Sequence, residues 1–246
     1  MKVLDLFSGG GGASMGIHQA LNESNIEHEI IGIDYRPFLR NIYPFKFVCL
    51  NALNIKTEWM EKFDLIWASP PCQKFSSSNY INKYLGRTSN WKDLIAPIRV
   101  KLLETKKPFV IENVWQAPLR RDLVLCGTMF DLGVFRHRIF EIEGFVCYQP
   151  VHPDHNGHIG DGTYFSIHRG PMFKNRGPKW KEFRKKHHNF QKWKDAMGVD
   201  WIPIPNTTEL PKMHPLTEAI PPAYSKYITQ QFLKKYISLE KWIKQK

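Results

Sequence analysis

Residues 5–16 read Asp5-Leu6-Phe7-Ser8-Gly9-Gly10-Gly11-Gly12-Ala13-Ser14-Met15-Gly16. The apolar residues on either side of Asp5 predict a short buried strand over residues 2–7. After the glycines, Met15, Ile17 and Leu21 recur on one side of an expected helix. Glycines between a strand and a helix let the backbone turn sharply and approach a nucleotide-like molecule closely. The stretch therefore predicts the first strand–turn–helix unit of a ligand-binding α/β fold.

The alternation of strand and helix continues along the first half of the chain. Apolar runs predict strands over 30–34, 47–50, 63–68 and 108–114, and a helical period predicts a helix over 92–104. Strands that alternate with helices form parallel βαβ units. We therefore expect an α/β fold with a Rossmann-like, doubly wound sheet, whose ligands lie beyond the carboxyl ends of the strands.

An acidic residue stands at the tip of the second predicted strand. Asp34 follows Gly32 and Ile33 and can accept hydrogen bonds from both hydroxyls of a ribose. Together with the glycine turn, this carboxylate predicts a ligand of the nucleotide type. A dinucleotide and S-adenosylmethionine both remain open at this point. The absence of a GxxxxGKS/T motif disfavours ATP hydrolysis through a P-loop.

The charge of the chain favours a polyanionic partner. Its 246 residues include 35 lysines and arginines against 23 aspartates and glutamates, which gives a net charge of +12. Net charge bears on partners rather than on fold, and nucleic acid is the commonest polyanion in cells. Nucleic acid is therefore the first partner to consider.

Several classes of protein are disfavoured by what the sequence lacks. No run of 18 apolar residues occurs, and the N-terminus lacks the apolar stretch of a signal peptide, so we expect a cytoplasmic protein with no membrane contact. Four widely spaced cysteines, with no CxxC pair, indicate neither a disulfide framework nor a zinc ribbon. A hydrophobic content of 42% excludes wholesale disorder.

The strand–helix pattern ends near Gly144, and an amphipathic helix returns at residues 223–246. Between them the hydrophobic period is weak, and His, Lys, Trp, Gly and Pro are frequent. We predict a main domain of residues 1–145 plus 214–246 and a small, irregular, basic insertion of residues 146–213. Cations interleaved with aromatic side chains in the insertion favour contact with nucleic acid.

Four side chains in the insertion have a spacing that metal sites also use: His152, Asp154, His155 and His158. No cysteine joins them in the sequence. We therefore expect a loop packed by hydrogen bonds between the rings, and no metal ion.

A cysteine follows the fourth predicted strand in the run Ser69-Pro70-Pro71-Cys72-Gln73. The two prolines fix the backbone ahead of the thiol. A reactive thiol has to be exposed and to lie in a field that favours the thiolate, and the loop that follows is polar and cationic. The position and surroundings of Cys72 therefore indicate a reactive residue rather than a structural one.

With further motifs in the same order, the sequence resembles the DNA cytosine-5 methyltransferases, in a compact form with a short target-recognition region. The resemblance covers roughly residues 1–145 and 214–235. It implies a Rossmann-like methyltransferase sheet and transfer of a methyl group from S-adenosylmethionine to carbon 5 of cytosine. The motifs are Asp5-Leu-Phe-Ser-Gly-Gly-Gly-Gly12, Gly32-Ile-Asp34-Tyr35, Asn51-Ala-Leu53, Pro70-Pro-Cys72-Gln-Lys-Phe-Ser76, Glu112-Asn-Val114, Arg136-His-Arg138 and Ala219-Ile-Pro-Pro-Ala-Tyr224.

The resemblance also implies catalytic roles for Cys72, Glu112, Arg136 and Arg138. Cys72 would add to carbon 6 of a cytosine flipped out of double-stranded DNA, which is covalent catalysis. Glu112 would supply a proton near N3, while Arg138 would hold the O2 atom and Arg136 would support the nucleophile loop. Alternation over residues 134–142 predicts a strand with both arginines on one face.

For the methyl donor, the resemblance implies contacts along the glycine turn and at the tips of neighbouring strands. The implied residues are Phe7, Ser8, Gly9, Gly11, Gly12, Asp34, Tyr35, Asn51, Ala52, Leu53, Pro70 and Ala219. One departure concerns the last motif, where Thr217-Glu218 stand in place of the Gly-Asn that is frequent in the family. An acid at this point would repel the carboxylate of the donor unless it is turned away.

Contacts with double-stranded DNA are expected from two cationic segments. They are Gln73, Ser76, Lys83 and Arg87 after the thiol, and Arg169, Lys174 and Arg176 in the insertion. We expect a monomer with no obligate protein partner, in the nucleoid of a prokaryotic or phage-infected cell. Restriction-modification, phage self-protection and regulation stay open as biological roles.

Three alternatives remain open from the sequence. One branch of the resembling family acts on tRNA with the same fold. A non-catalytic DNA-binding module is disfavoured by the intact set of Cys72, Glu112 and Arg138. A related sulfonium compound could replace S-adenosylmethionine as the donor, and the masses of the product nucleosides would distinguish the two.

Overall fold

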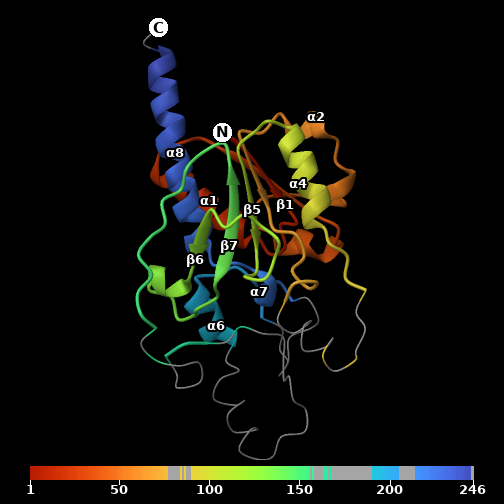
Figure 1. Cartoon of the computed structure of the whole chain (residues 1–246), viewed down its shortest axis with the longest axis vertical. Coiled ribbons are helices and arrows are strands. Elements are labelled where there is room, and N and C mark those ends of the chain that lie inside the picture. Colours follow the sequence, from red (N-terminus) through yellow and green to blue (C-terminus); the bar gives the residue numbers. More distant parts are fainter. Residues whose placement is uncertain are drawn as a thin grey trace, which may run out of the picture.

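The computed structural model describes residues 1–76, 84, 86, 90–155, 157, 163–165, 167, 190–204 and 214–244. Its centre is a seven-stranded sheet with the strand order β3-β2-β1-β4-β5-β7-β6 (Figure 1). The first five strands lie parallel, whereas β7 runs antiparallel to both of its neighbours. The strands are β1 (Lys2–Leu6), β2 (Glu29–Asp34), β3 (Lys46–Cys49), β4 (Leu65–Ala68), β5 (Phe109–Asn113), β6 (Leu123–Leu125) and β7 (Arg138–Glu143).

The α/β class and the doubly wound, mainly parallel sheet predicted from the sequence are confirmed. The sequence pattern does not reveal β6, which has only three residues. The strand expected over residues 134–142 is wrong in its first half, because β7 begins at Arg138 and Arg136 precedes it with a φ angle of 36°. A residue with a left-handed backbone does not continue a pleated strand, so the two arginines do not share a strand face.

Helices cover both faces of the sheet: α1 and α8 lie on one face, and α2 and α4 lie on the other (Figure 1). The helices expected over 92–104 and 223–246 are confirmed as α4 and α8. Within the described ranges, no helix is long and apolar enough to cross a bilayer. The helices are α1 (Gly12–Glu23), α2 (Thr57–Met60), α4 (Ile95–Glu104), α6 (Phe190–Met197), α7 (Pro215–Glu218) and α8 (Pro222–Lys244), with 3-10 turns at Pro37–Asn41, Ala52–Asn54 and Gly127–Phe130.

The strand order reverses direction at the centre of the sheet. β1 has β2 on one side and β4 on the other, so the chain winds outward from this point in two directions. The backbone N–H of Ser69, just after β4, donates to the carbonyl of Leu6 at 3.1 Å. The loops that follow β1 and β4 therefore start side by side, and a crevice forms between them at the carboxyl ends of the strands.

Alternate residues of the central strands face opposite helical layers, because side chains on a strand alternate between its two faces. Trp67 of β4 and Val110 of β5 pack in one apolar cluster with residues of α1 and α8. Ile66 and Ile111, their neighbours along the chain, pack in a second cluster with α4. Burial on both faces explains why these strands read as continuous apolar runs.

The glycines of α1 allow the C-terminal part of the chain to approach very closely. A Cβ atom on Gly16 would overlap the carbonyl oxygen of Pro222 and the hydroxyl of Ser225, and one on Gly12 would overlap the carbonyl oxygen of Ile220. Only glycine fits at both positions without displacing the backbone opposite. This approach places residues 217–220 against the glycine turn.

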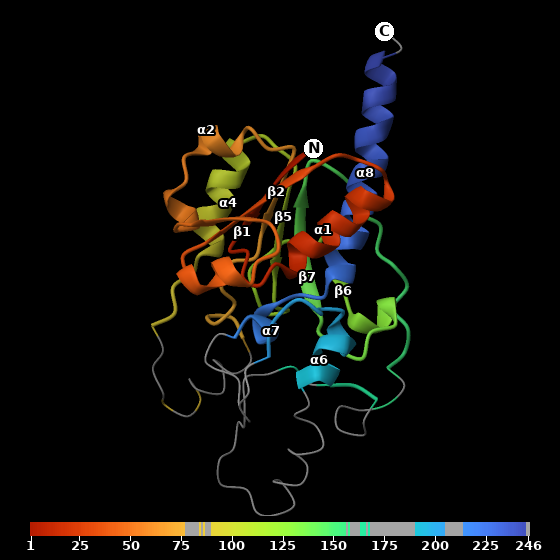
Figure 2. The same ribbon diagram turned by 180° about the vertical axis from the view of Figure 1, so that it is seen from behind.

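Part of the predicted insertion packs on the main domain. Helix α6 contributes Trp193 and Met197 to an apolar cluster with Val134 and Ala219. The indole N–H of Trp201 donates to the carbonyl of Gly10 at 2.7 Å. Helices α6 and α7 both lie beyond the carboxyl ends of the strands (Figure 2). The boundaries of the insertion, at 146 and 213, stay a prediction.

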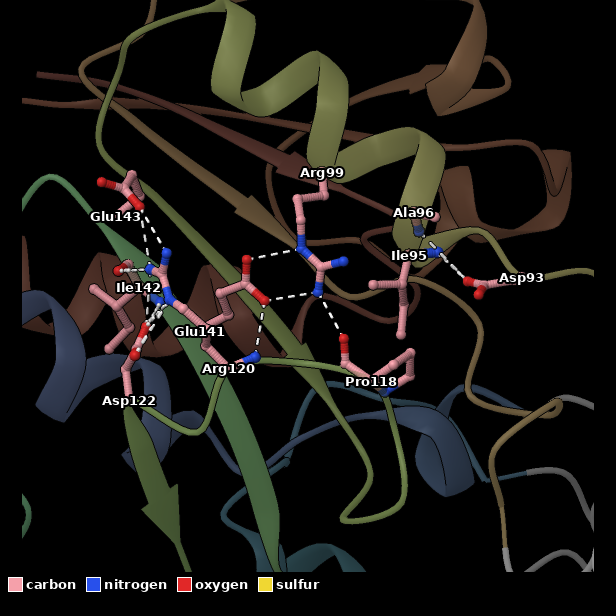
Figure 3. Close-up of polar contacts among 10 residues, drawn as sticks. All are labelled: Asp93, Ile95, Ala96, Arg99, Pro118, Arg120, Asp122, Glu141, Ile142 and Glu143. Carbon is pink, nitrogen blue, oxygen red and sulfur yellow. Dashed lines mark hydrogen bonds and ion pairs between the residues drawn. The ribbon is translucent and has the colours of Figure 1, made fainter.

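A buried ion pair joins α4 to β7 (Figure 3). The Arg99 guanidinium donates to both carboxylate oxygens of Glu141, at 2.8 and 2.7 Å, and to the carbonyl of Pro118 at 2.7 Å. The backbone N–H of Arg120 donates to the same carboxylate at 3.1 Å. Since Glu141 is 3% exposed, its charge depends on these donors for compensation.

The replacement Arg99→Met should lower the free energy of unfolding by about 3 kcal/mol, because Glu141 would remain buried without its partner. The double variant Arg99→Met/Glu141→Leu should recover most of this loss, because the stranded charge is removed as well. As a control, Lys46→Met breaks an ion pair with Glu29 whose lysine side chain is 69% exposed, and it should cost less than about 1 kcal/mol. Urea unfolding measures all three. Equal losses for Arg99→Met and Lys46→Met would contradict the role assigned to the buried pair.

Candidate active site

A pocket opens at the switch point of the sheet, beyond the ends of β1, β2, β4 and β5. Its empty space amounts to about 870 Å³, including the part that is open to solvent. Segments that are far apart in the sequence, from Asp5 to Ile220, contribute to its lining.

Most of the site residues predicted from the sequence line this pocket together. They are Phe7, Ser8, Gly9, Gly12, Asp34, Tyr35, Pro70, Cys72, Gln73, Glu112, Arg136, Arg138 and Ala219.

Five predicted residues lie outside the lining. Gly11 has a φ angle of 86° and packs against Tyr43 and Pro44. Ala52 is 3% exposed within the core. The Asn51 side chain accepts a hydrogen bond from the backbone N–H of Leu53 at 3.0 Å, and so caps a short turn. The fifth is Ser76, which donates to the carbonyl of Gln73 at 3.2 Å. Predictions for Lys83, Arg87, His158, Arg169, Lys174 and Arg176 lie outside the described residues.

The loop that carries the thiol is held by the neighbouring strand. Asn113, the last residue of β5, donates from its Nδ2 atom to the carbonyl of Pro70 at 2.8 Å. Its Oδ1 atom accepts from the backbone N–H of Val114 at 2.9 Å. The Asn113 side chain thus fixes the double-proline turn relative to Glu112, the residue before it. Asn113 belongs to the motif Glu112-Asn-Val114, but the resemblance implies no role for its side chain.

Cys72 is half-buried, and two opposing influences act on its thiol. Burial and the nearby carboxylate of Glu112 raise the pKa of Cys72, whereas Arg138 and Arg136 lower it. Burial has the largest effect, so the pKa of the thiol lies above its ordinary value. Both arginines favour the thiolate, but burial outweighs them.

A carboxylate and a guanidinium pair beside the thiol. The Nε atom of Arg138 lies 2.9 Å from Oε1 of Glu112. Glu112 is 6% exposed, and burial raises its pKa while Arg138 and the Ser69 hydroxyl lower it. The Glu112 carboxyl therefore holds a proton more readily than an exposed glutamate does.

Arg136 connects the pocket to the C-terminal part of the chain. Its guanidinium donates to the carbonyl of Thr217 at 2.8 Å, and the hydroxyl of Tyr224 on α8 donates to the Arg136 carbonyl at 3.0 Å. Burial and the neighbouring charge of Arg138 lower the pKa of Arg136. The left-handed turn before β7 thus brings both arginines to the pocket, though not by the strand alternation that was predicted.

Arg36 lines the pocket, although it is absent from the site residues predicted from the sequence. Its guanidinium donates to both carboxylate oxygens of Asp34, each at 3.0 Å, and to Glu218 at 2.6 Å. These two carboxylates raise the pKa of Arg36, which keeps it charged. The ion pair with Arg36 also compensates the charge of Glu218, which stands where the family often has asparagine. A signal was present in the sequence, since a pocket with two acids requires a cation and Arg36 follows Asp34 closely.

Four buried polar atoms in the lining have no hydrogen-bond partner in the described part of the chain: Asp5 Oδ1, Ser8 Oγ, Gln73 Oε1 and Arg136 Nε. Buried polar groups in folded proteins are nearly always paired, because leaving one unpaired costs free energy. Their common location in one pocket indicates that a polar molecule binds there.

The strand order and the pocket at the switch point define a doubly wound α/β protein, with a pocket at the place where ligands bind in such folds. Residues 1–122 match the family described as C-5 cytosine-specific DNA methylase. This match places residues 1–122 in the cytosine-5 methyltransferase family.

Individual relatives come from two groups within this family. The human tRNA (cytosine(38)-C(5))-methyltransferase is 30% identical over 146 residues, which are 53% of this chain and 36% of the relative. Type II methyltransferase M.HindV of Haemophilus influenzae is 33% identical over 140 residues, 47% of this chain and 38% of the relative. The matched part thus spans little more than a third of these relatives.

A solved structure confirms the fold. The Entamoeba histolytica methyltransferase EhMeth superposes with a TM-score of 0.52 and 15% identity, covering 95% of this chain and 97% of that structure. At this identity the likeness concerns the arrangement of helices and strands.

Alkylation of Cys72 by iodoacetamide should be slow at neutral pH and should keep rising above pH 9.0, because the pKa of the thiol is raised from that value. Glu112→Gln should move the profile to lower pH, since it removes a carboxylate that raises the pKa. Peptide mass spectrometry measures the rate at Cys72 separately from that at the other cysteines. A rate that reaches its plateau near neutral pH in the parent protein would contradict the assignment.

Proposed function

We propose that this protein transfers a methyl group from S-adenosylmethionine to carbon 5 of a flipped-out cytosine in double-stranded DNA, through a covalent bond to Cys72. One observation carries the proposal. The thiol of Cys72 and the Glu112–Arg138 pair line the same pocket as the glycine turn and the Asp34 carboxylate. Residues that could activate a cytosine, such as Cys72 and Glu112, therefore line the same pocket as Asp34, which could bind a nucleoside.

The lining of the pocket fits the donor. Phe7 and Tyr35 would pack against the adenine, and Asp34 would accept hydrogen bonds from the ribose hydroxyls. The unpaired hydroxyl of Ser8 is available beside the glycine turn. When bound, S-adenosylmethionine supplies an electrophilic methyl group on a sulfonium centre.

Three side chains would act on the cytosine. Carbon 5 is a poor nucleophile, and addition of the Cys72 sulfur to carbon 6 turns the ring into an enamine that is nucleophilic at carbon 5. Glu112, whose pKa is raised by burial, would donate a proton at N3 and so draw electrons into the ring during the addition. Arg138, held by Glu112 at 2.9 Å, would donate to the O2 atom.

The thiol has to lose its proton before it adds. Its raised pKa disfavours this step, while Arg136 and Arg138 on the pocket wall favour it. Protonation of Glu112 would remove one of the charges that raise the pKa of Cys72. Binding of the base would therefore couple the two groups: the thiol would lose its proton to water while Glu112 still holds its own proton against N3, and Glu112 would transfer that proton to N3 as the sulfur adds to carbon 6.

The choice of DNA over tRNA rests on the matched family, whose description specifies DNA, and on a net charge of +12, which suits either polyanion. A duplex base can reach Cys72 only after flipping, which costs a few kcal/mol. Transfer to a tRNA cytosine is the second candidate, because one similar human protein is named as a tRNA methyltransferase. Similarity to type II methyltransferases supports a role in restriction-modification.

Incubation with radiolabelled S-adenosylmethionine should place label in duplex DNA and not in tRNA, and nucleoside mass spectrometry should identify 5-methylcytosine. Cys72→Ala should lower the rate by at least about 10³-fold, because covalent activation has no substitute in this pocket. Cys147→Ser is the matched control, since Cys147 lies away from the pocket near α8, and it should keep the parent rate.

The outcomes of this assay separate the candidates. Label in tRNA alone would favour the second candidate, and no transfer to either substrate by a protein that binds both would favour a non-catalytic module. A product mass other than that of 5-methylcytosine would indicate a different sulfonium donor. In duplex DNA that contains 5-fluorocytosine, the parent protein should form a covalent complex through Cys72, since fluorine cannot leave as a proton does.

Donor binding should depend on the balance of charge around Arg36. Arg36→Met leaves the Glu218 carboxylate unneutralised near the carboxylate of the ligand, so the affinity for S-adenosylhomocysteine should fall by about tenfold, equivalent to ~1.4 kcal/mol. The double variant Arg36→Met/Glu218→Gln should recover part of this loss. Arg40→Met removes an exposed cation from the same turn and serves as control. Calorimetric titration measures all four proteins, and unchanged affinity in Arg36→Met would refute the charge balance.

A further inference from the structure

Four side chains from three separate segments converge beside the edge of the sheet. Cys126 directly follows β6, His137 directly precedes β7, and His152 and His155 belong to the segment that leads from β7 into the insertion. One sulfur and three imidazoles each offer an atom to this group, and these atoms all lie within 4.8 Å of one another.

Two distances within the group are close to those of a tetrahedral metal centre. Cys126 Sγ lies 3.4 Å from Nε2 of His155, and Nε2 of His137 lies 3.1 Å from Nε2 of His152. Zinc–sulfur bonds of about 2.3 Å and zinc–nitrogen bonds of about 2.0–2.1 Å separate neighbouring ligand atoms by roughly 3.3–3.6 Å in a tetrahedron. A small contraction around an ion would satisfy this geometry.

Contacts outside the four atoms orient the ligands. The Nδ1 atom of His152 lies 2.7 Å from the carbonyl of Pro153, to which it donates, so that Nε2 keeps its lone pair for a metal. The hydroxyl of Thr128 donates to Cys126 Sγ at 3.2 Å. The ring of His155 stacks on Phe135, with the centroids 4.0 Å apart. Such outer contacts are typical of metal-binding histidines.

The sequence pattern alone leads to a different expectation. It groups His152 and His155 with Asp154 and His158 and lacks a cysteine, which favours ring hydrogen bonds and no metal. In the structure Asp154 is not part of the group, and Cys126 and His137 take part from distant positions. The fold thus supplies the thiol that the local sequence lacks. A hydrogen bond between His137 and His152 explains why these two side chains lie together. It does not explain why Cys126 and His155 join them.

We propose that Cys126, His137, His152 and His155 bind one Zn²⁺ ion in a closed, structural site. Nitrogen and sulfur ligands in a tetrahedral arrangement select zinc over the hard cations magnesium and calcium. Four protein ligands leave no open position for water or substrate, which distinguishes a structural site from a catalytic one. The ion would join the start of the insertion to the edge of the sheet.

The position of His137 gives this site a further effect. His137 stands between Arg136 and Arg138, the two arginines of the pocket. A metal bond to its ring would restrain the left-handed turn that aims both guanidiniums. The test of the site itself measures metal and stability, and so does not depend on the proposed methyl transfer.

The test uses the full chain without a polyhistidine tag. Mass spectrometry of the metal content should find about one zinc per chain after purification, and again after chelation and reloading with zinc. His152→Gln and His155→Gln should each lower zinc affinity by at least about tenfold, since losing even an outer contact of a ligand costs that much. Both histidines are exposed, so these variants keep the fold even where Cys126→Ser does not. Cys49→Ser and His28→Gln are the controls and should bind zinc as the parent does.

Two further measurements make the result decisive. Cobalt(II) reloading should give the intense visible bands of a tetrahedral ion and a thiolate charge-transfer band that His155→Gln weakens and Cys126→Ser abolishes. Chelation should lower the melting temperature of the parent protein and leave that of His155→Gln nearly unchanged. A parent protein that retains no stoichiometric zinc after reloading, or a His155→Gln variant that binds it as tightly as the parent, would overturn the proposal.

Discussion

The close packing of the first and last helices is the constraint on which the pocket depends. Gly12 and Gly16 leave no room for a side chain between α1 and the segment that begins at Ile220. Because the two backbones touch there, Thr217, Glu218 and Ala219 reach the pocket. Apart from Ile220, the rest of the pocket wall comes from residues between Asp5 and Arg138. The glycines therefore do more than bend the chain toward a ligand, since they also determine which distant segment completes the wall.

Charge in the pocket is balanced by a few specific pairs. Arg36 spans Asp34 and Glu218, and Arg138 lies against Glu112, so each of these carboxyl groups has a cationic neighbour. Burial nevertheless raises the pKa of both Cys72 and Glu112 and favours their neutral forms. A resting site with a protonated thiol is less exposed to oxidation, and the same arginines remain in position to stabilise the thiolate when it forms.

The sequence predicts the sheet well because each parallel strand is a short, mainly apolar segment that ends in a recognisable turn. It predicts most of the pocket for the same reason, since ligand residues follow the tips of these strands. The failures have physical causes. The pairing of Arg36 with Glu218 and the grouping of Cys126 with three histidines join residues distant in sequence, and no periodicity records such contacts. The left-handed backbone at Arg136 likewise has no signal in the sequence, where polar and apolar residues still alternate as they do in a strand.

The contribution of residues 217–220 to the pocket has a consequence for biosynthesis. A ribosome makes the strands of the sheet long before it makes the segment that completes the wall, and a nascent chain begins to fold as it emerges. Until α8 can dock on α1, the growing polypeptide has a nearly finished sheet whose apolar face toward α8 is uncovered. Premature termination between the end of β7 and Pro222 would therefore yield an aggregation-prone fragment rather than a weakened version of the whole protein.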